Sequence, residues 1–243
     1  ARARLRAAAR GDWLALLDAD DRFAPDRLAR LVTLGERRRA DIVADNLRLV
    51  SAEGRDNGRA LAADDRLFAA PLTAAAFVQR NLFLTPGFKL GYLKPLFRRD
   101  FVMRHGLRQD EGLRIAEDFH FLLDALMAGG SFVADAEPGY DYRLTPGSLS
   151  RGLSLADLQR LSAANRAVRA RVDADAALGR ALERRQRSVD LNVEFTRFVE
   201  AVKGRRARAA GSIFARHPDL TPFLAFYGLQ SLRRRLPGGR DIV

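Results

Sequence analysis

Three aspartates follow a short apolar run near the start of the chain, in the segment WLALLDADDRFAPDRL, residues 13–28. The run reads as a buried strand, and it leads directly into Asp18, Asp20 and Asp21. Carboxylates crowded at the end of a strand need cations, hydrogen-bond donors or water, because burying them without partners is costly. The pattern therefore predicts that a positively charged group belongs at this turn.

The position of these acids favours ligand binding, because open α/β sheets usually bind ligands beyond the carboxyl ends of their strands. If strand geometry continues, Asp18 and Asp20 point the same way and could share a divalent cation and the diphosphate that it neutralises. A plainer interpretation is that Asp20 or Asp21 caps a helix that begins near Pro25. The spacing alone leaves both interpretations open.

A second acidic pair, Glu117 and Asp118, opens the segment EDFHFLLDALM, whose apolar spacing predicts a helix over residues 117–127. A helix N-terminus stabilises carboxylates through its dipole, so capping alone would explain the pair. His120 lies two positions further on, where it could line a pocket or pack against the core. The residues by themselves leave these choices open.

Basic residues near both acidic segments offer weaker signals. Arg143, in the segment YDYRLTPGSLS of residues 140–150, could form paired hydrogen bonds with a phosphate, or it could be a surface arginine without a role. Four further basic residues precede the acidic pair of the helix, and we expect them to be solvated charges: Lys89, Lys94, Arg98 and Arg99.

Composition excludes several classes of protein. The chain has 243 residues, 47% hydrophobic and 30% charged, which is typical of a soluble globular protein that buries a sizeable core. Without cysteine there are no disulfides and no thiolate ligands, so oxygen or histidine must hold any metal. No apolar run approaches the roughly 20 residues of a membrane span, and the N-terminus lacks the apolar core of a signal peptide. We therefore expect a cytoplasmic location.

Charge is unevenly distributed along the chain. Residues 1–150 carry 23 Lys/Arg against 21 Asp/Glu, whereas residues 151–243 carry 19 against 9. A basic appendage on a nearly neutral body suggests an anionic partner, with a solvated arginine-rich surface as the alternative. The segment 160–187 lacks the interleaved aromatics of nucleic-acid binders. Peripheral attachment to the inner face of the plasma membrane fits better, because apolar residues accompany the basic cluster 233–235: Phe214, Leu224, Phe226 and Leu229.

The order of expected elements predicts an α/β fold, with a boundary near residue 151 and long arginine-rich helices after it. An apolar face of those helices is expected at Val189, Val193, Val199 and Val202. The elements expected before the boundary are a helix over 1–10, a strand over 13–17, a helix after Pro25, a strand over 41–50, a helix over 68–83, and one or two short strands around Pro138 and Gly139.

The segment ARARLRAAARGDWLALLDADDRFAPDRLARLV resembles, in order, spacing and composition, the central segment of family 2 glycosyltransferases of the GT-A fold. It departs from the usual pattern at Ala3, where Asn is common, and at Leu5, where Gly is common. The phosphatases of the haloacid dehalogenase type fit poorly, because Asp21 and Arg22 follow the DxD in place of Gly-Thr. The resemblance covers residues 1–150 and implies a Rossmann-like mixed sheet. It also implies that the nucleotide-binding strands with which family members begin lie upstream of this sequence.

The resemblance implies an inverting transferase of the exopolysaccharide type, which moves single sugars from a nucleotide-sugar donor to a saccharide or lipid-linked hydroxyl acceptor. An ED pair about a hundred residues after DxD implies Asp118 as catalytic base and Glu117 as its supporting acid. The remaining roles that the resemblance implies are donor binding by Asp18 and Arg143, acceptor binding by His120, and Mg²⁺ or Mn²⁺ binding by Asp20.

A different class of function remains open beside the enzyme. Without its upstream strands the chain could be a catalytically inactive remnant, whose basic C-terminal region, residues 151–243, serves as a module that binds a membrane surface. Metal-dependent release of nucleoside diphosphate distinguishes the two hypotheses.

Overall fold

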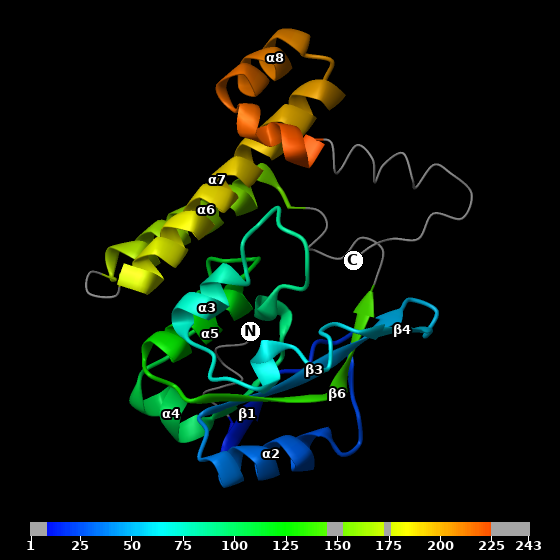
Figure 1. The fold of residues 1–243 in the computed structure, drawn as a ribbon, viewed down its shortest axis with the longest axis vertical. Helices are drawn as coiled ribbons and strands as arrows, with labels where there is room; N and C mark the ends of the chain where they lie inside the picture. Colours follow the sequence, from blue (N-terminus) through cyan, green and yellow to red (C-terminus); the bar gives the residue numbers. More distant parts are fainter. Residues whose placement is uncertain (1–8, 145–152, 173–175, 225–243) are drawn as a thin grey trace. The chain divides into compact units, whose positions relative to one another are not determined.

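The computed structural model describes residues 9–144, 153–172 and 176–224. The chain divides into two compact units: Ala1–Asn81 with Lys89–Gly152, and Leu82–Phe88 with Leu153–Val243 (Figure 1). The sequence pattern did not show that the short segment Leu82–Phe88 joins the helical unit. Of the described residues, none lies in a helix that is both long enough and apolar enough to cross a membrane.

A mixed sheet forms the centre of the first unit, and the predicted α/β fold class is therefore confirmed. Its path runs β1-β5-β3-β6-β2, with β4 paired to β3; β3 and β6 are parallel and the other pairs are antiparallel. The strands are β1 (Trp13–Ala15), β2 (Arg22–Phe23), β3 (Ile42–Ser51), β4 (Asp56–Arg59), β5 (Leu96–Arg98) and β6 (Phe132–Leu144).

One long strand, β6, replaces the one or two short strands expected around Pro138 and Gly139. Its register against β3 runs from Phe132 to Asp135, is interrupted, and resumes at Tyr140 opposite Leu47. Gly139 is required at the interruption, because a Cβ there would lie 2.5 Å from both the Asp45 carboxylate and the Arg30 guanidinium. The irregularity sets the position at which Tyr140 emerges beside β2.

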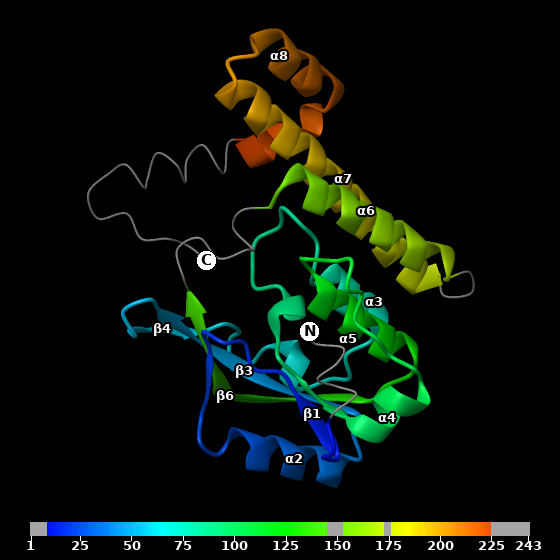
Figure 2. The same ribbon diagram turned by 180° about the vertical axis from the view of Figure 1, so that it is seen from behind.

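Helices cover both faces of this sheet (Figures 1 and 2). The helix α2 (Arg27–Arg38) lies on one face and packs Leu31 against Val43 and Leu96. The other face carries α3 (Ala74–Gln79), α4 (Arg99–Arg104) and α5 (Glu117–Met127), with the 3₁₀ turns η1 (Arg66–Phe68) and η2 (Leu90–Tyr92) on the connections.

Local sequence signals explain which expected elements are correct. The helix over 117–127 has the predicted bounds, and it buries Phe119, Phe121, Leu122 and Leu123. The helix expected over 68–83 is shorter, because Pro71 breaks the pattern and Thr73 caps a new start by accepting a hydrogen bond from the Ala76 amide. The first strand ends at Ala15 rather than at residue 17. Most of the helix expected over 1–10 lies outside the described residues.

The second unit is built from α6 (Leu155–Ala170), α7 (Ala176–Lys203), α8 (Ala207–Arg216) and the turn η4 (Pro218–Leu220). Val189 and Val193 are buried as expected, but Val202 is exposed, so the predicted apolar face is wrong at its C-terminal end. Ala201, Ala210, Ile213 and Leu220 form a separate cluster where α7 meets α8. The basic cluster 233–235, with Phe226 and Leu229, lies outside the described residues.

Candidate active site

The acidic turn that follows β1 is tied to β6 by its last aspartate. The Tyr140 hydroxyl donates to Asp21 Oδ2 at 2.7 Å, and the Arg143 backbone N–H donates to Asp21 Oδ1 at 2.8 Å. The same hydroxyl accepts a hydrogen bond from the Asp18 amide at 3.2 Å. The capping interpretation of Asp20 or Asp21 is wrong, because Asp26 holds the N-cap position of α2 and makes no side-chain cap bond.

Burial raises the pKa of two side chains at this turn, Asp21 and Tyr140. It raises the pKa of Asp21, although the hydrogen bonds from the Arg143 amide and the Tyr140 hydroxyl act in the opposite direction. Burial also raises the pKa of Tyr140, so the phenol remains a hydrogen-bond donor at neutral pH. Asp20 directly precedes Asp21 and is exposed to solvent.

Lys94 is the positive group that the acidic turn was predicted to need. Its ammonium lies 2.7 Å from Asp118 Oδ2 and 2.9 Å from Asp18 Oδ2, and its side chain is only 6% exposed. The prediction of a solvated charge at Lys94 is therefore wrong. Burial opposes the charged form, but the carboxylates of Asp118 and Asp18 outweigh it and raise the pKa of Lys94, so Lys94 is an ammonium ion at neutral pH.

The backbone of Lys94 is fixed by a second, fully buried ion pair. Its carbonyl accepts a hydrogen bond of 2.6 Å from the Arg27 guanidinium, which also contacts both carboxylate oxygens of Asp45 on β3. Pro95 follows at once and restricts Lys94 to extended backbone conformations. Both ends of Lys94 are therefore held by groups distant in sequence.

Asp118 stands in the first turn of α5, where the helix dipole favours its carboxylate. Its second oxygen, Oδ1, accepts a hydrogen bond of 3.0 Å from the Gln109 side chain. The helix is entered through Ala116, which has a left-handed backbone with φ of 58°. Such a conformation costs about 1–3 kcal/mol for a residue with a side chain and is found most often at functional sites.

The predicted site residues fall into two groups. The structure brings Asp18 and Asp118 together through Lys94, with Asp20 on the same turn and Glu117 beside Asp118 in the first turn of α5. His120 is buried and meets the Phe119 ring edge to face, and the Arg143 side chain is exposed while only its backbone contact to the turn is described. Residues 145–150, the rest of the third segment, lie outside the described residues.

Sequence reasoning missed Lys94, Gln109 and Tyr140. The contacts of Lys94 with Asp18 and of Tyr140 with Asp21 join positions far apart in the chain, whereas Gln109 lies nine residues from Asp118. No local periodicity shows any of the three. One signal for Lys94 was available: it stands in the run YLKPLF, where apolar neighbours favour burial over exposure.

Metal binding at the turn depends on how many ligands the protein must supply. The described part of the chain holds no group of three or more His, Cys, Asp or Glu side chains arranged to bind a metal ion. Mg²⁺ is commonly held by only one or two carboxylates, with substrate phosphates and water completing its shell. The exposed carboxylate of Asp20 fits a cation that arrives with a diphosphate.

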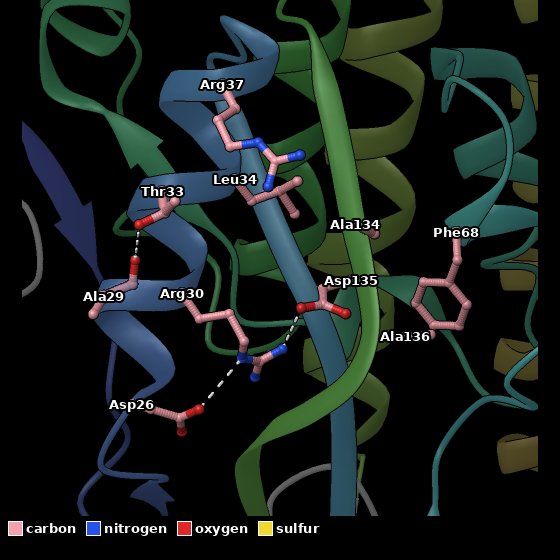
Figure 3. A pocket seen from close by; sticks show the side chains of 10 residues that line it. All are labelled: Asp26, Ala29, Arg30, Thr33, Leu34, Arg37, Phe68, Ala134, Asp135 and Ala136. Atoms are coloured by element: carbon pink, nitrogen blue, oxygen red, sulfur yellow. Dashed lines mark hydrogen bonds and ion pairs between the residues drawn. The ribbon is translucent and has the colours of Figure 1, made fainter.

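Two cavities differ in their relation to these residues. A small one, of about 10 Å³, lies beside Lys94 and Asp118 among apolar side chains that include Leu16 and Phe121. A larger one, of about 610 Å³, lies between α2 and β6 (Figure 3). There Arg30 points towards Asp135 and Asp26 and pairs with both, so we assign no chemistry to the larger cavity.

Comparisons with known proteins agree with this architecture. Residues 1–101 match the family model described as "Glycosyl transferase family 2". Succinoglycan biosynthesis protein ExoO of Rhizobium meliloti is 37% identical over 204 residues, which cover 84% of this chain and 58% of that protein. Succinoglycan biosynthesis protein ExoU of the same organism is 32% identical over 218 residues, covering 86% and 61%. The chain thus spans less than two thirds of these relatives.

A solved structure shows the same fold. This chain superposes on the crystal structure of S. aureus TarS 1–349 in complex with UDP-GlcNAc with a TM-score of 0.56 and 13% sequence identity. The match covers 90% of this chain and 71% of the TarS chain. At that identity the likeness speaks for the fold alone.

Proposed function

Since this chain belongs to glycosyl transferase family 2, we propose that it moves a single sugar from a nucleotide-sugar donor to a hydroxyl acceptor with inversion at the anomeric carbon. The strongest support is the bridge through Lys94, which joins Asp118 to Asp18 on the turn that follows β1. A candidate base and a candidate donor-binding turn therefore lie on two sides of one ammonium group. This is the edge of the sheet at which α/β proteins usually bind their ligands.

Three similar proteins support the proposed classes of donor and acceptor. TarS was crystallised with UDP-GlcNAc, which supports a nucleoside diphosphate sugar as donor. ExoO and ExoU are named as succinoglycan biosynthesis proteins, which supports a saccharide hydroxyl, free or lipid-linked, as acceptor.

Asp118 would act as the general base. It takes the proton from the acceptor hydroxyl while that oxygen forms a bond to the anomeric carbon. The bond from that carbon to the diphosphate oxygen breaks, and its electron pair leaves with the nucleoside diphosphate. Asp118 accepts hydrogen bonds from Lys94 and Gln109, and its side chain is 16% exposed, so an acceptor hydroxyl would approach it from the exposed side.

Asp20 would hold Mg²⁺ or Mn²⁺ together with the donor phosphates, and such a cation neutralises a diphosphate leaving group. Asp18 would contribute to the donor side of the site from the same turn. The remaining donor contacts proposed for this chain come from Arg143, whose side chain is exposed and whose backbone N–H donates to Asp21.

Nucleoside diphosphate release tests the proposal. We would measure it from a panel of nucleotide sugars with saccharide acceptors, with and without Mn²⁺. Asp118→Asn should lower transfer more than about 100-fold, because it removes the base. Asp20→Asn should remove the dependence on Mn²⁺, and Asp64→Asn, which changes an exposed acid elsewhere in the first unit, should leave both unchanged. Full transfer by Asp118→Asn, or none by a wild-type protein that is folded by circular dichroism, would refute it.

We propose an anionic membrane surface as a second partner, because the helical unit exposes basic and apolar residues side by side in sequence. Four exposed basic residues lie where α7 ends and α8 begins: Lys203, Arg205, Arg206 and Arg208. Val202 and Phe214 are exposed large apolar residues of the same two helices. Each basic residue near an anionic surface contributes about 1 kcal/mol of attraction, and exposed apolar side chains add insertion.

Vesicle flotation tests the membrane proposal. Vesicles that contain phosphatidylglycerol should retain the protein at low salt and release it at high salt, since the attraction is screened. Arg205→Glu with Arg206→Glu should reduce retention several-fold more than the charge-matched pair Arg180→Glu with Arg184→Glu, which lies in the first half of α7. Equal retention by neutral vesicles would contradict the idea.

A further inference from the structure

We propose that Lys94 is a positioning residue for transfer, which fixes the base Asp118 against the donor-side turn through Asp18. This inference rests on the function proposed above and adds a residue to it. Lys94 does not touch the reacting atoms in this scheme; it acts through the two carboxylates that it joins.

The choice of lysine is informative because this chain is so rich in arginine. Only three of its 42 basic residues are lysines: Lys89, Lys94 and Lys203. An ammonium is a compact charge with three donors, whereas a guanidinium is a larger planar fork. Lysine therefore suits a bridge between two carboxylates in a confined, buried space, and the chain has one at this position.

Lys94 is held rigidly enough to position other groups. Its carbonyl is fixed by the buried Arg27, and it lines a small cavity together with Leu93, Phe97 and Leu122, each nearly or fully buried. The cavity beside its ammonium measures only about 10 Å³, which leaves little room for the side chain to move. The distance between Asp18 and Asp118 is therefore set by a group with few alternative positions.

The double pairing matters during the reaction itself. When Asp118 takes the proton from the acceptor, it becomes neutral and ceases to balance the buried ammonium. Asp18 remains as a counter-ion at 2.9 Å, so the charge of Lys94 is never left alone in the interior. A lysine bound only to the base would resist that step.

Chemical rescue provides the test, because the chain contains no cysteine. Lys94→Cys can be alkylated in the unfolded state and refolded. Alkylation with 2-bromoethylamine gives an aminoethyl form, whose side chain has the length and the ammonium group of lysine. Alkylation with 1-bromopropane gives a propyl form of the same length, in which a methyl group replaces the ammonium. We expect the propyl form to lose about 100-fold in kcat, with the donor KM changed less than about threefold, and the aminoethyl form to recover most of it. Wild type carried through the same steps controls for refolding.

Equal kcat in the two alkylated forms, both folded by circular dichroism, would overturn the inference. Lys94→Met, produced without refolding, gives a second measurement, and wild-type kcat in that variant would also overturn it. Arg104→Met is its control, since it removes an exposed charge from the same unit. If wild type transfers sugar but the aminoethyl form gains nothing over the propyl form, the positioning role fails while the proposed function stands.

The pairing of Lys94 with the two carboxylates can also be tested by NMR, without measuring sugar transfer. With ¹³C at the ε position only three lysine signals exist, and the Lys94 signal should stay constant between about pH 8 and 11, where ordinary lysines titrate. In Asp118→Asn it should move within that range. An ordinary titration of Lys94 in wild type would overturn the inference even if the protein transfers sugar. Wild type without transfer but with the constant signal would refute the proposed function and its positioning role, leaving a structural ion pair.

Discussion

Two ionic clusters meet at Lys94, one through its backbone carbonyl and the other through its ammonium. Arg27 and Asp45 form the first, and both side chains are essentially inaccessible to solvent. Asp18 and Asp118 flank the ammonium in the second, and they remain 27% and 16% exposed. Both clusters pair charges in the interior, but only the second presents carboxylates at the surface.

The difference teaches how pairing and chemistry can be separated within one site. The Arg27–Asp45 pair has no access to a substrate, and burial raises the pKa of Asp45 against the opposing influence of Arg27. The two carboxylates of the Lys94 cluster are partly exposed to solvent. The first cluster therefore holds the fold around Lys94, and only the second is accessible to a substrate.

Removing Arg27 should break the first cluster with the largest effect on stability. Arg27→Met removes the closest partner of the buried Asp45 carboxylate and leaves it only the longer contact to Arg30, at 3.5 Å, so it should lower the free energy of unfolding by up to about 3–5 kcal/mol, as measured by urea titration. Arg22→Met is the matched control: it removes an exposed guanidinium paired with Asp141 and should cost less than about 1 kcal/mol.

A double variant sharpens this prediction. Arg27→Met with Asp45→Leu removes both charges, so it should regain much of the stability lost in Arg27→Met alone. If the double variant were no more stable than the single one, the lost hydrogen bond from Arg27 to the Lys94 carbonyl, rather than the poorly compensated charge of Asp45, would explain the loss.

The sequence predicted the features that depend on local spacing, but not the contacts between distant residues that build the site. The helix Glu117–Met127 and the strand Ile42–Ser51 were predictable almost to the residue, because their apolar spacing is a local property. The acidic turn was recognised as a place that needs a positive group, but its partner was not, because Lys94 lies 76 residues from Asp18 in sequence and 24 from Asp118. Pairing of this kind depends on the sheet order, which periodicity does not reveal.

The hydroxyl of Tyr140 links the turn to β6, and its removal should have an intermediate effect. Tyr140→Phe removes the donor to Asp21 and the acceptor of the Asp18 amide, so unfolding should become easier by about 1–2 kcal/mol. If the turn binds the donor, the donor KM should rise while kcat changes little. Tyr92→Phe, which changes a more exposed tyrosine, serves as control, and an unchanged KM in Tyr140→Phe would separate this hydroxyl from donor binding.

The smallest effect is expected at a partly exposed ion pair, Arg80 with Asp65, which calibrates the two buried clusters. Hydrogen bonds from Arg80 lower the pKa of Asp65, with burial acting in the opposite direction. A carboxylate with a lowered folded-state pKa stabilises the fold above its unfolded-state value, near 3.8, and loses that contribution as pH falls through the folded-state value. Arg80→Met should therefore cost about 0.5–1 kcal/mol at pH 7 and almost nothing near pH 2. Urea titrations of both proteins at the two pH values measure this, and an equal cost at both would assign the effect of Arg80 to packing of its stem rather than to charge.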